Sequence, residues 1–240
     1  MEERLRAFWD RDAEIYDRAP AHGISDPGEA AAWRAVLARH LPPPPARVLD
    51  VGAGTGSISL LAAELGHEVT GLDLSPGMLE RARAKAEARG LRIRFVVGRS
   101  EEPPEGPFDA VVERHLLWTL PDPGRALAAW RTATVPGGRL LLLEGLWGRG
   151  RLRERAGDLV RRLLRVPPDH HAPYPPDVLA SLPLARLSSP RPVVQAVAGA
   201  GWRRIRIERL REVERARRRA ERWPLGLLEH AVRYALTAEA

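Results

Sequence analysis

A chain of 240 residues is long enough for one well-buried core with local additions and too short for two large domains. Cysteine is absent, which excludes disulfides, thiolate metal sites and iron–sulfur clusters, as well as any mechanism with a cysteine nucleophile. The formal net charge is +7, but its cations are almost all arginines, and we interpret them as a solvated basic surface, so that a nucleic-acid partner is not expected.

The amino-terminal stretch, residues 1–12, is dense in charge, and no uncharged apolar run approaches the roughly 18–20 residues that cross a bilayer. We therefore expect a cytoplasmic protein without a membrane partner, and no metal site is predicted. The first elements are helices over residues 3–18 and 28–40. A proline run, Pro42–Pro45, separates this predicted helical cap, residues 1–45, from the rest of the chain.

From residue 46 to residue 145 the pattern alternates between short β-branched runs and helical segments. Such alternation indicates βα units, and hence a parallel sheet covered on both faces. The predicted segments, strands and helices in chain order, are Val48–Val51, Ser57–Leu65, Val69–Leu72, Pro76–Arg89, Ile93–Val97, Ala110–Val112, Gly124–Thr134 and Leu140–Leu143.

After Glu144 the alternation stops, and an arginine-rich amphipathic helix is followed by a proline-rich stretch, Pro167–Pro192. We interpret residues 146–192 as a lid on the substrate side, although the helix could equally be the interface of a homodimer. Residues 193–240 are predicted to complete the sheet, with a helix at 193–200, a strand at 205–210, a basic helix at 212–222 and a strand at 232–236. The apolar stripe of the arginine-rich helix consists of Leu152, Ala156, Leu159, Val160, Leu163 and Leu164.

The most informative motif is Val48–Ser57, a strand that runs into a glycine-rich turn and then a helix. Glycines there allow positive φ and a close approach of the backbone to a ligand. A dinucleotide-binding fingerprint would need its third glycine at position 57, which is Ser57; the third glycine here is Gly56. Asp73, at the end of the second strand, can accept hydrogen bonds from both hydroxyls of a ribose.

Five segments in order together resemble the class I S-adenosylmethionine-dependent methyltransferases. The resemblance implies a Rossmann-like three-layer sandwich whose seven-stranded sheet is mostly parallel with an antiparallel last strand. It also implies S-adenosyl-L-methionine as cofactor and S-adenosyl-L-homocysteine as product. The segments are the glycine motif, Gly71–Leu79, Phe108–Val112, Leu120–Pro123 and Pro136–Leu140.

The resemblance also implies roles for single residues. The cofactor's methionine moiety would lie along residues 52–56, its ribose on Asp73 and its adenine against Leu74 and Met78, although Met78 could equally be ordinary helix packing. Glu113 would offer its backbone carbonyl to the cofactor's ammonium group, with a side chain that can simply be solvated. The glycine-motif residues assigned to the cofactor are Asp50, Gly52, Ala53, Gly54 and Gly56.

The chain departs from the family pattern after Gly98, where relatives often carry an aspartate that accepts from the adenine amine and this chain has Arg99. An arginine cannot accept a hydrogen bond. It either stacks on the adenine or, as we favour, points into solvent while Ser100 and Glu101 meet the ring. In the amino-terminal cap, Tyr16 would close over the cofactor or, alternatively, dock the helix on the core.

The segment after the fourth predicted strand, Glu113–Trp118, would face the methyl donor from the substrate side. His115 is the candidate general base, because an unperturbed imidazole titrates near neutral pH, although a structural role is the alternative. His170, His171 and Tyr174 in the lid could reach the same cavity or be solvated.

The same segment lacks the Asn-Pro-Pro-Tyr motif typical of enzymes that methylate exocyclic amines of bases or of glutamine, and RNA cytosine carbon-5 methylation needs a cysteine. A small-molecule acceptor is therefore the leading hypothesis. Together with Leu143–Trp147, the segment looks like bacterial tailoring methyltransferases of secondary metabolism. The competing functions are a tRNA or rRNA methyltransferase and a non-catalytic protein that binds S-adenosyl ligands.

Overall fold

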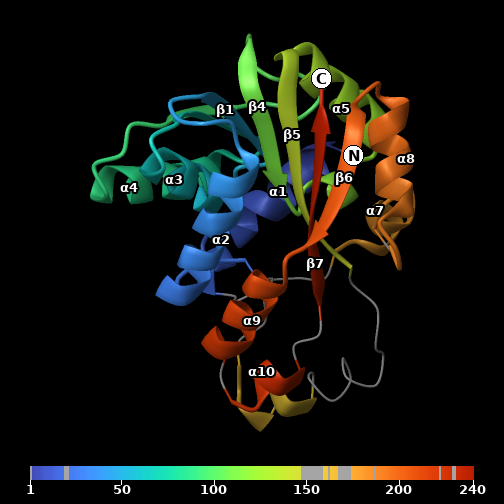
Figure 1. The fold of residues 1–240 in the computed structure, drawn as a ribbon. Helices are drawn as coiled ribbons and strands as arrows, with labels where there is room; N and C mark the ends of the chain where they lie inside the picture. The colour runs from blue at the N-terminus through green and yellow to red at the C-terminus, as the bar shows by residue number, and fades with distance from the viewer. Residues whose placement is uncertain are drawn as a thin grey trace.

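The computed structural model describes residues 2–18, 22–146, 159–161, 163–166, 174–185, 187–221, 223–228 and 231–240. A seven-stranded sheet with the order β3-β2-β1-β4-β5-β7-β6 forms its centre (Figure 1). β7 pairs antiparallel with β5 and β6, whereas the pairs from β3 to β5 are parallel. The predicted sheet is thus confirmed. The strands are β1 (Arg47–Val51), β2 (Glu68–Asp73), β3 (Arg94–Val97), β4 (Phe108–Arg114), β5 (Thr134–Leu146), β6 (Arg203–Arg209) and β7 (Val232–Glu239).

Helices cover both faces of the sheet and make two apolar cores. On one face, Trp33 of α2 and Ile58 of α3 pack with buried valines of β1 and β4. On the other face, Trp130 of α5 and Val197 of α8 pack with leucines of β5. The helices are α1 (Glu2–Asp12), α2 (Pro27–His40), α3 (Ser57–Glu64), α4 (Pro76–Ala88), α5 (Pro123–Thr132), α7 (Pro176–Ser181), α8 (Arg191–Gly199), α9 (Arg211–Ala220) and α10 (Leu225–Leu228), with short 3₁₀ helices η1 (Tyr16–Arg18) and η2 (Leu117–Thr119).

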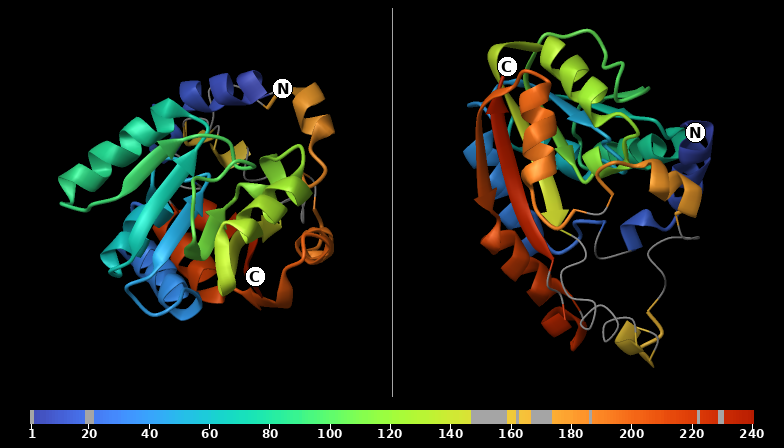
Figure 2. Two further views of the ribbon diagram at one scale, coloured as in Figure 1. Left: turned by 90° about the horizontal axis from the view of Figure 1, so that it is seen from above. Right: turned by 90° about the vertical axis from the view of Figure 1, so that its right-hand side faces the viewer.

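The amino-terminal cap differs from the single helix expected over residues 3–18. α1 ends at Asp12, whose side chain is buried, and the amide of Ile15 donates to the Asp12 carbonyl in a tighter turn that leads into η1. Two ion pairs hold α1 in place, between Glu2 and Arg99 and between Arg4 and Asp177 of α7. Figure 2 shows α1 and α7 side by side, so the start of the chain lies against a segment far away in sequence.

A buried cation joins α2 to α9. The guanidinium of Arg217 is 2% exposed and lies 3.3 Å from Glu29 and 3.4 Å from Glu221. Because both carboxylates are themselves buried, the guanidinium offsets part of their negative charge in a place that water does not reach.

Other elements depart from expectation in their length. β5 already begins at Thr134, through a stretch where Gly138 lies so close to the Asp109 carbonyl that a Cβ would be 2.9 Å from it. α7 and α10 fall where no helix was predicted, because each is short and close to prolines.

Two leucines of the apolar stripe of the arginine-rich segment are exposed rather than buried. Leu159 is 59% exposed and Leu163 is 73% exposed. Leu152, Ala156, Trp147, His170 and His171 lie outside the described residues. Within the part of the chain that the structure describes, every helix is too short or too polar to cross a lipid bilayer.

Candidate functional site

The glycine turn after β1 forms one wall of a cavity at the carboxyl ends of the central strands. Gly52 and Gly54 have φ of +66° and +54°, a conformation that favours glycine. A Cβ on Gly52 would lie 2.8 Å from Leu116, whereas one on Gly54 would meet nothing closer than 3.9 Å. The backbone at Gly54 is therefore open to a ligand.

Asp73 lies at the end of β2 and faces the same cavity. Its carboxylate accepts from the backbone amides of Gly54 (2.7 Å) and Ser75 (2.8 Å). Burial raises its pKa to about 6, in spite of the backbone hydrogen bonds from Ser75 and Gly54. An acceptor of this kind at the edge of a cavity fits a ligand that offers hydroxyl donors.

The cavity has a volume of about 570 Å³, which suits a cofactor-sized molecule. Its lining joins residues from the amino-terminal cap, from the first three strands and from the segment after β4. Of the residues predicted to form the site, those that line it are Tyr16, Gly52, Gly54, Asp73, Leu74, Met78, Arg99, Ser100, Glu101 and His115.

Three residues of the glycine motif that were assigned to the cofactor lie behind this wall. Asp50 is buried and accepts from the hydroxyl of Ser59 (2.5 Å), and burial raises its pKa to about 7. Gly56 lets α3 approach α4, because a Cβ there would be 2.9 Å from that of Ala82. Ala53 donates its amide to the Leu72 carbonyl. In the structure, these residues shape the turn rather than line the cavity.

The side chain of Glu113 is buried, so our interpretation of it as solvated was wrong. Its carboxylate accepts from the amides of Leu116 (2.7 Å) and Leu117 (3.3 Å) and thereby fixes the turn after β4. Burial raises its pKa to about 8. The sequence pattern gave no indication of this, because a carboxylate that caps a local turn looks like any surface acid.

His115 follows immediately and faces the cavity. Its φ of +61° is unusual for a residue with a side chain, and such backbone outliers gather at functional sites. Its Nδ1 lies 3.6 Å from Oε2 of the buried Glu144. Burial, with the nearby Arg114 and Arg233, lowers the pKa of His115 well below its ordinary value, while burial and Glu113 raise that of Glu144. At neutral pH the imidazole is neutral.

Arg99 lines the cavity, and its role toward an adenine stays a prediction. It forms an ion pair with Glu2 and lies 3.8 Å from both Glu101 and Glu102, with its side chain 38% exposed. Since Glu2 and Arg99 both line the cavity, this pair connects the start of α1 with the loop after β3.

Aromatic rings close the cavity from the side of α1. The ring of Tyr16 stacks on His22 at 4.4 Å and meets Trp9 edge-on at 6.0 Å. The ring of Tyr174 lies 4.7 Å from that of Phe8 and 5.8 Å from that of Trp118. Tyr174 is thus packed against rings of α1 and the turn after β4 and does not itself line the cavity.

Several lining residues were missed by the sequence analysis. Glu2, Leu5 and Trp9 come from α1, and Thr119 and Leu120 from the turn after β4. Trp9 belongs to the same stretch as Tyr16, and its spacing of seven residues, two turns of the predicted helix on one face, was the available signal. Glu144 could not be found, because only the pairing of β4 with β5 brings it to His115.

Comparison with known proteins agrees with this geometry. A family described as "Methyltransferase domain" matches residues 49–142. The demethylmenaquinone methyltransferase of Thermus thermophilus is 42% identical over 104 residues, 42% of this chain and 47% of that protein. The ribosomal protein L11 methyltransferase of Thermus thermophilus is 42% identical over 130 residues, 53% of this chain and 46% of that protein. The chain spans about half the length of these curated relatives.

Among solved structures, phosphoethanolamine N-methyltransferase 2 of Haemonchus contortus in complex with S-adenosyl-L-methionine is similar in fold. It superposes with a TM-score of 0.67 at 20% identity, over 98% of this chain and 59% of that one. The likeness covers the sheet together with the helices on both of its faces.

Proposed function

Because the chain belongs to the class I S-adenosylmethionine-dependent methyltransferases, we propose that it transfers a methyl group from S-adenosylmethionine to a small-molecule acceptor. One observation carries the proposal: the same cavity is lined by the glycine turn and Asp73 and by His115 with the rings of Trp9 and Tyr16. Such an arrangement has room for a donor and an acceptor in contact.

The cofactor end of the cavity fits S-adenosylmethionine by its chemistry. The Asp73 carboxylate would accept from the ribose hydroxyls, and the open backbone at Gly54 leaves space for the methionine moiety. Met78 and Leu74 would pack on the adenine, with Ser100 and Glu101 at its edge. When bound, the cofactor supplies a methyl group on a sulfonium, which is already activated for transfer.

At the acceptor end, the protein's part is to exclude water and to hold the acceptor in line. Apolar side chains line the cavity, among them Leu116, Leu120 and the ring of Trp9. Alignment of this kind can supply about 7–11 kcal/mol of a reaction barrier. We infer that the acceptor is flat or largely apolar, because a charged molecule would lose its hydration in this end of the cavity.

If the acceptor carries a proton that must leave, His115 is the residue to take it. Burial keeps its imidazole neutral at pH 7, the state in which a ring nitrogen accepts a proton. Glu144, 3.6 Å from Nδ1, would orient the ring.

The direct test is methyl transfer from radiolabelled S-adenosylmethionine to a panel of phenols, catechols and aromatic amines, with bulk tRNA and purified ribosomal protein L11 as further acceptors. We expect label only in small molecules. Label in tRNA or in the protein alone would overturn the small-molecule acceptor. Binding of S-adenosylhomocysteine without transfer to any acceptor would support the non-catalytic alternative.

The role of His115 is tested by His115→Ala, with His40→Ala at the end of α2 as a matched control, because the side chain of His40 is about as exposed (13% against 15%) but does not line the cavity. We expect a loss of kcat of about 100-fold or more with a phenol acceptor, at nearly unchanged affinity for S-adenosylhomocysteine. Equal losses in kcat and cofactor affinity would indicate a structural residue, and unaltered kinetics would refute the proposal.

We also infer that the described part of residues 174–182 closes the acceptor side. Tyr174 packs on Phe8 and Trp118, and Asp177 pairs with Arg4, so this segment and α1 cover the cavity together. Tyr174→Ala should raise KM for the acceptor about tenfold and leave cofactor affinity unchanged, as measured by steady-state kinetics and calorimetry. An unchanged KM would refute this assignment.

A further inference from the structure

The outer face of α9 is a stripe of arginines. Arg211, Arg215, Arg218 and Arg219 are all exposed, and their spacing of i, i+4, i+7 and i+8 puts them on one side of the helix. No described acidic side chain forms an ion pair with any of them. The acids of α9 are instead engaged elsewhere, since Glu212 pairs with Arg39, Glu214 with Arg209 and Glu221 with Arg217. The stripe is therefore a surface of uncompensated positive charge.

An apolar tip follows directly after this stripe. Trp223 is 82% exposed and Leu227 is 72% exposed, four residues apart on α10 and the turn before it. Between them, Leu225 is buried, and Gly226 lies so close to α9 that a Cβ would be 2.2 Å from the Arg218 carbonyl. α10 is thus anchored on the end of α9, with the side chains of Trp223 and Leu227 turned outward.

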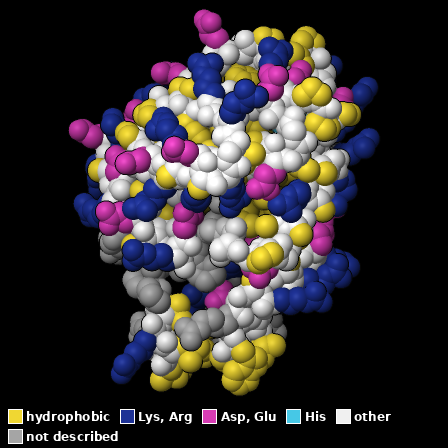
Figure 3. Space-filling model, turned by 90° about the vertical axis from the view of Figure 1, so that its left-hand side faces the viewer, with side chains coloured by type: hydrophobic (Ala, Val, Ile, Leu, Met, Phe, Trp, Pro, Cys, Tyr) yellow, Lys and Arg dark blue, Asp and Glu magenta, His cyan; other side chains and the backbone are white. Residues whose placement is uncertain are grey.

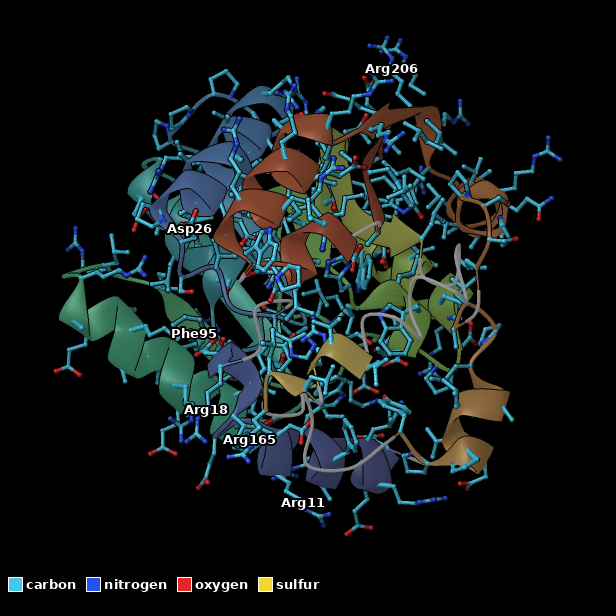
Figure 4. The ribbon with its side chains drawn as sticks, turned by 90° about the horizontal axis from the view of Figure 1, so that it is seen from below. Arg11, Arg18, Asp26, Phe95, Arg165 and Arg206 are labelled. Carbon is cyan, nitrogen blue, oxygen red and sulfur yellow. The ribbon has the colours of Figure 1, made fainter. Side chains whose placement is uncertain are left out.

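A second segment adds to the same tip. Leu159 and Leu163 are 59% and 73% exposed, and Figures 1 and 2 show this segment beside α10 at one end of the molecule. Figure 3 shows hydrophobic side chains gathered at that end, with Lys and Arg side chains around them. Arg165, from the same segment, is an exposed cation on the side seen from below (Figure 4).

We propose that the tip formed by Leu159, Leu163, Trp223 and Leu227, with the arginine stripe of α9, docks on the surface of an anionic lipid bilayer. Apolar side chains beside a row of cations match the two layers of a bilayer surface, acyl chains below and negatively charged headgroups above. A Trp ring suits that boundary, since it is apolar with one polar N–H. This departs from the expectation of no membrane partner, and it does not depend on the proposed activity.

The charge pattern favours a bilayer over the other possible occupants. A second copy of this chain would bring the same arginines face to face, which is repulsive. A nucleic acid would neutralise the stripe and could stack a base on Trp223, but Leu159, Leu163 and Leu227 offer a base no stacking surface and would stay exposed. Only a partner with negative charge above and hydrocarbon beneath satisfies both parts of the tip.

The test is flotation of the full chain with vesicles of phosphatidylcholine, with and without phosphatidylglycerol. We expect binding only to vesicles with the anionic lipid, released by salt. Trp223→Ser with Leu227→Ser, and separately Arg218→Glu with Arg219→Glu, should each weaken binding by about tenfold or more. The matched control is Arg206→Glu with Ile207→Ser on the edge strand β6, which changes one exposed cation and one exposed apolar residue away from the tip and should bind as the wild type does.

Absence of flotation with the anionic vesicles would overturn the proposal, as would equal losses in the control and the tip variants. Sedimentation provides a second readout: a dimer that Trp223→Ser with Leu227→Ser converts to a monomer, without vesicle binding by the wild type, would assign the tip to self-association. A mobility shift of tRNA without vesicle binding would assign the stripe to nucleic acid and refute the bilayer. Melting temperatures of all variants check that the fold is intact.

Discussion

Asp73→Asn should make the ligand-free protein more stable at about pH 8 while it weakens cofactor binding. Burial raises the pKa of Asp73 from 3.8 to about 6 on folding. For an acid, such a rise means that stability is fully present below the unfolded value and is lost as pH rises through the folded one. At about pH 8 the ionised carboxylate therefore lowers the free energy of unfolding by about 3 kcal/mol.

Asparagine removes this charge and keeps the shape of the side chain. It also loses one acceptor for the two backbone amides of Gly54 and Ser75, at a cost of about 1–2 kcal/mol. The net gain in the free energy of unfolding is about 1–2 kcal/mol, or about 2–8 °C in Tm for a chain of this size. At about pH 4 the gain should vanish, because Asp73 is then protonated in the folded protein.

Cofactor binding should change in the opposite direction. Two hydrogen bonds from ribose hydroxyls to a carboxylate contribute about 3 kcal/mol or more, so the affinity for S-adenosylhomocysteine should fall about 150-fold. Calorimetry measures the affinity, and thermal melts at both pH values measure the stability. Asp109→Asn, an exposed carboxylate that accepts from the Arg47 amide, is the control. A ligand-free Asp73→Asn protein that melts below the wild type at pH 8, or binds within about tenfold of it, would refute the reasoning.

Three further predictions concern the turn after β1, the buried acid of β4 and the buried cation of α9. Gly52→Ala places a Cβ 2.8 Å from Leu116 at a positive φ, so the free energy of unfolding measured with a chemical denaturant should fall by about 1–2 kcal/mol or more. The affinity for S-adenosylhomocysteine should fall as well, and an affinity equal to that of the wild type would contradict the tight packing. Glu113→Gln mimics the protonated acid, whose pKa burial raises from 4.5 to about 8, so Tm should match the wild type near about pH 4 and exceed it by a margin that grows up to about pH 8; an equal dependence of both proteins on pH would show that burial does not raise this pKa. Arg217→Ala leaves Glu29 and Glu221 buried without their cation and should cost about 3–5 kcal/mol without change in cofactor affinity, whereas a loss below about 1 kcal/mol in urea unfolding would mean that water reaches the pair.

The sequence was sufficient for those parts of the fold that depend on local pattern. Short β-branched runs and glycines needed for positive φ mark the sheet and the turn at Gly52 and Gly54, and the structure has both. The position of Asp73 beside the glycine turn follows from the same pattern, because Asp73 ends β2 and β2 pairs in parallel with β1, which leads into the turn. Hydrophobic periodicity did not predict that α1 ends at the buried Asp12, or that β5 already begins at Thr134.

The rest of the candidate site depends on contacts between distant parts of the chain. Glu2 meets Arg99, and His115 meets Glu144, only after the sheet and the cap have formed. No local signal distinguishes such an acid from a solvated one. The contributions of the predicted residues to cofactor binding, and of His115 to catalysis, stay predictions until the variants are measured.

The position of β7 has a consequence for how the chain is made in the cell. β7 lies between β5 and β6, so the strand that joins β6 to the sheet is synthesised after both of its neighbours. Until residues 232–239 leave the ribosome, β5 presents a long unpaired edge of buried leucines, and β6 has no partner. Exposed edges of this kind are where nascent chains aggregate. Translation that stalls before this point should therefore yield an insoluble product, and chaperones that bind unpaired apolar strands should associate with this chain late in its synthesis.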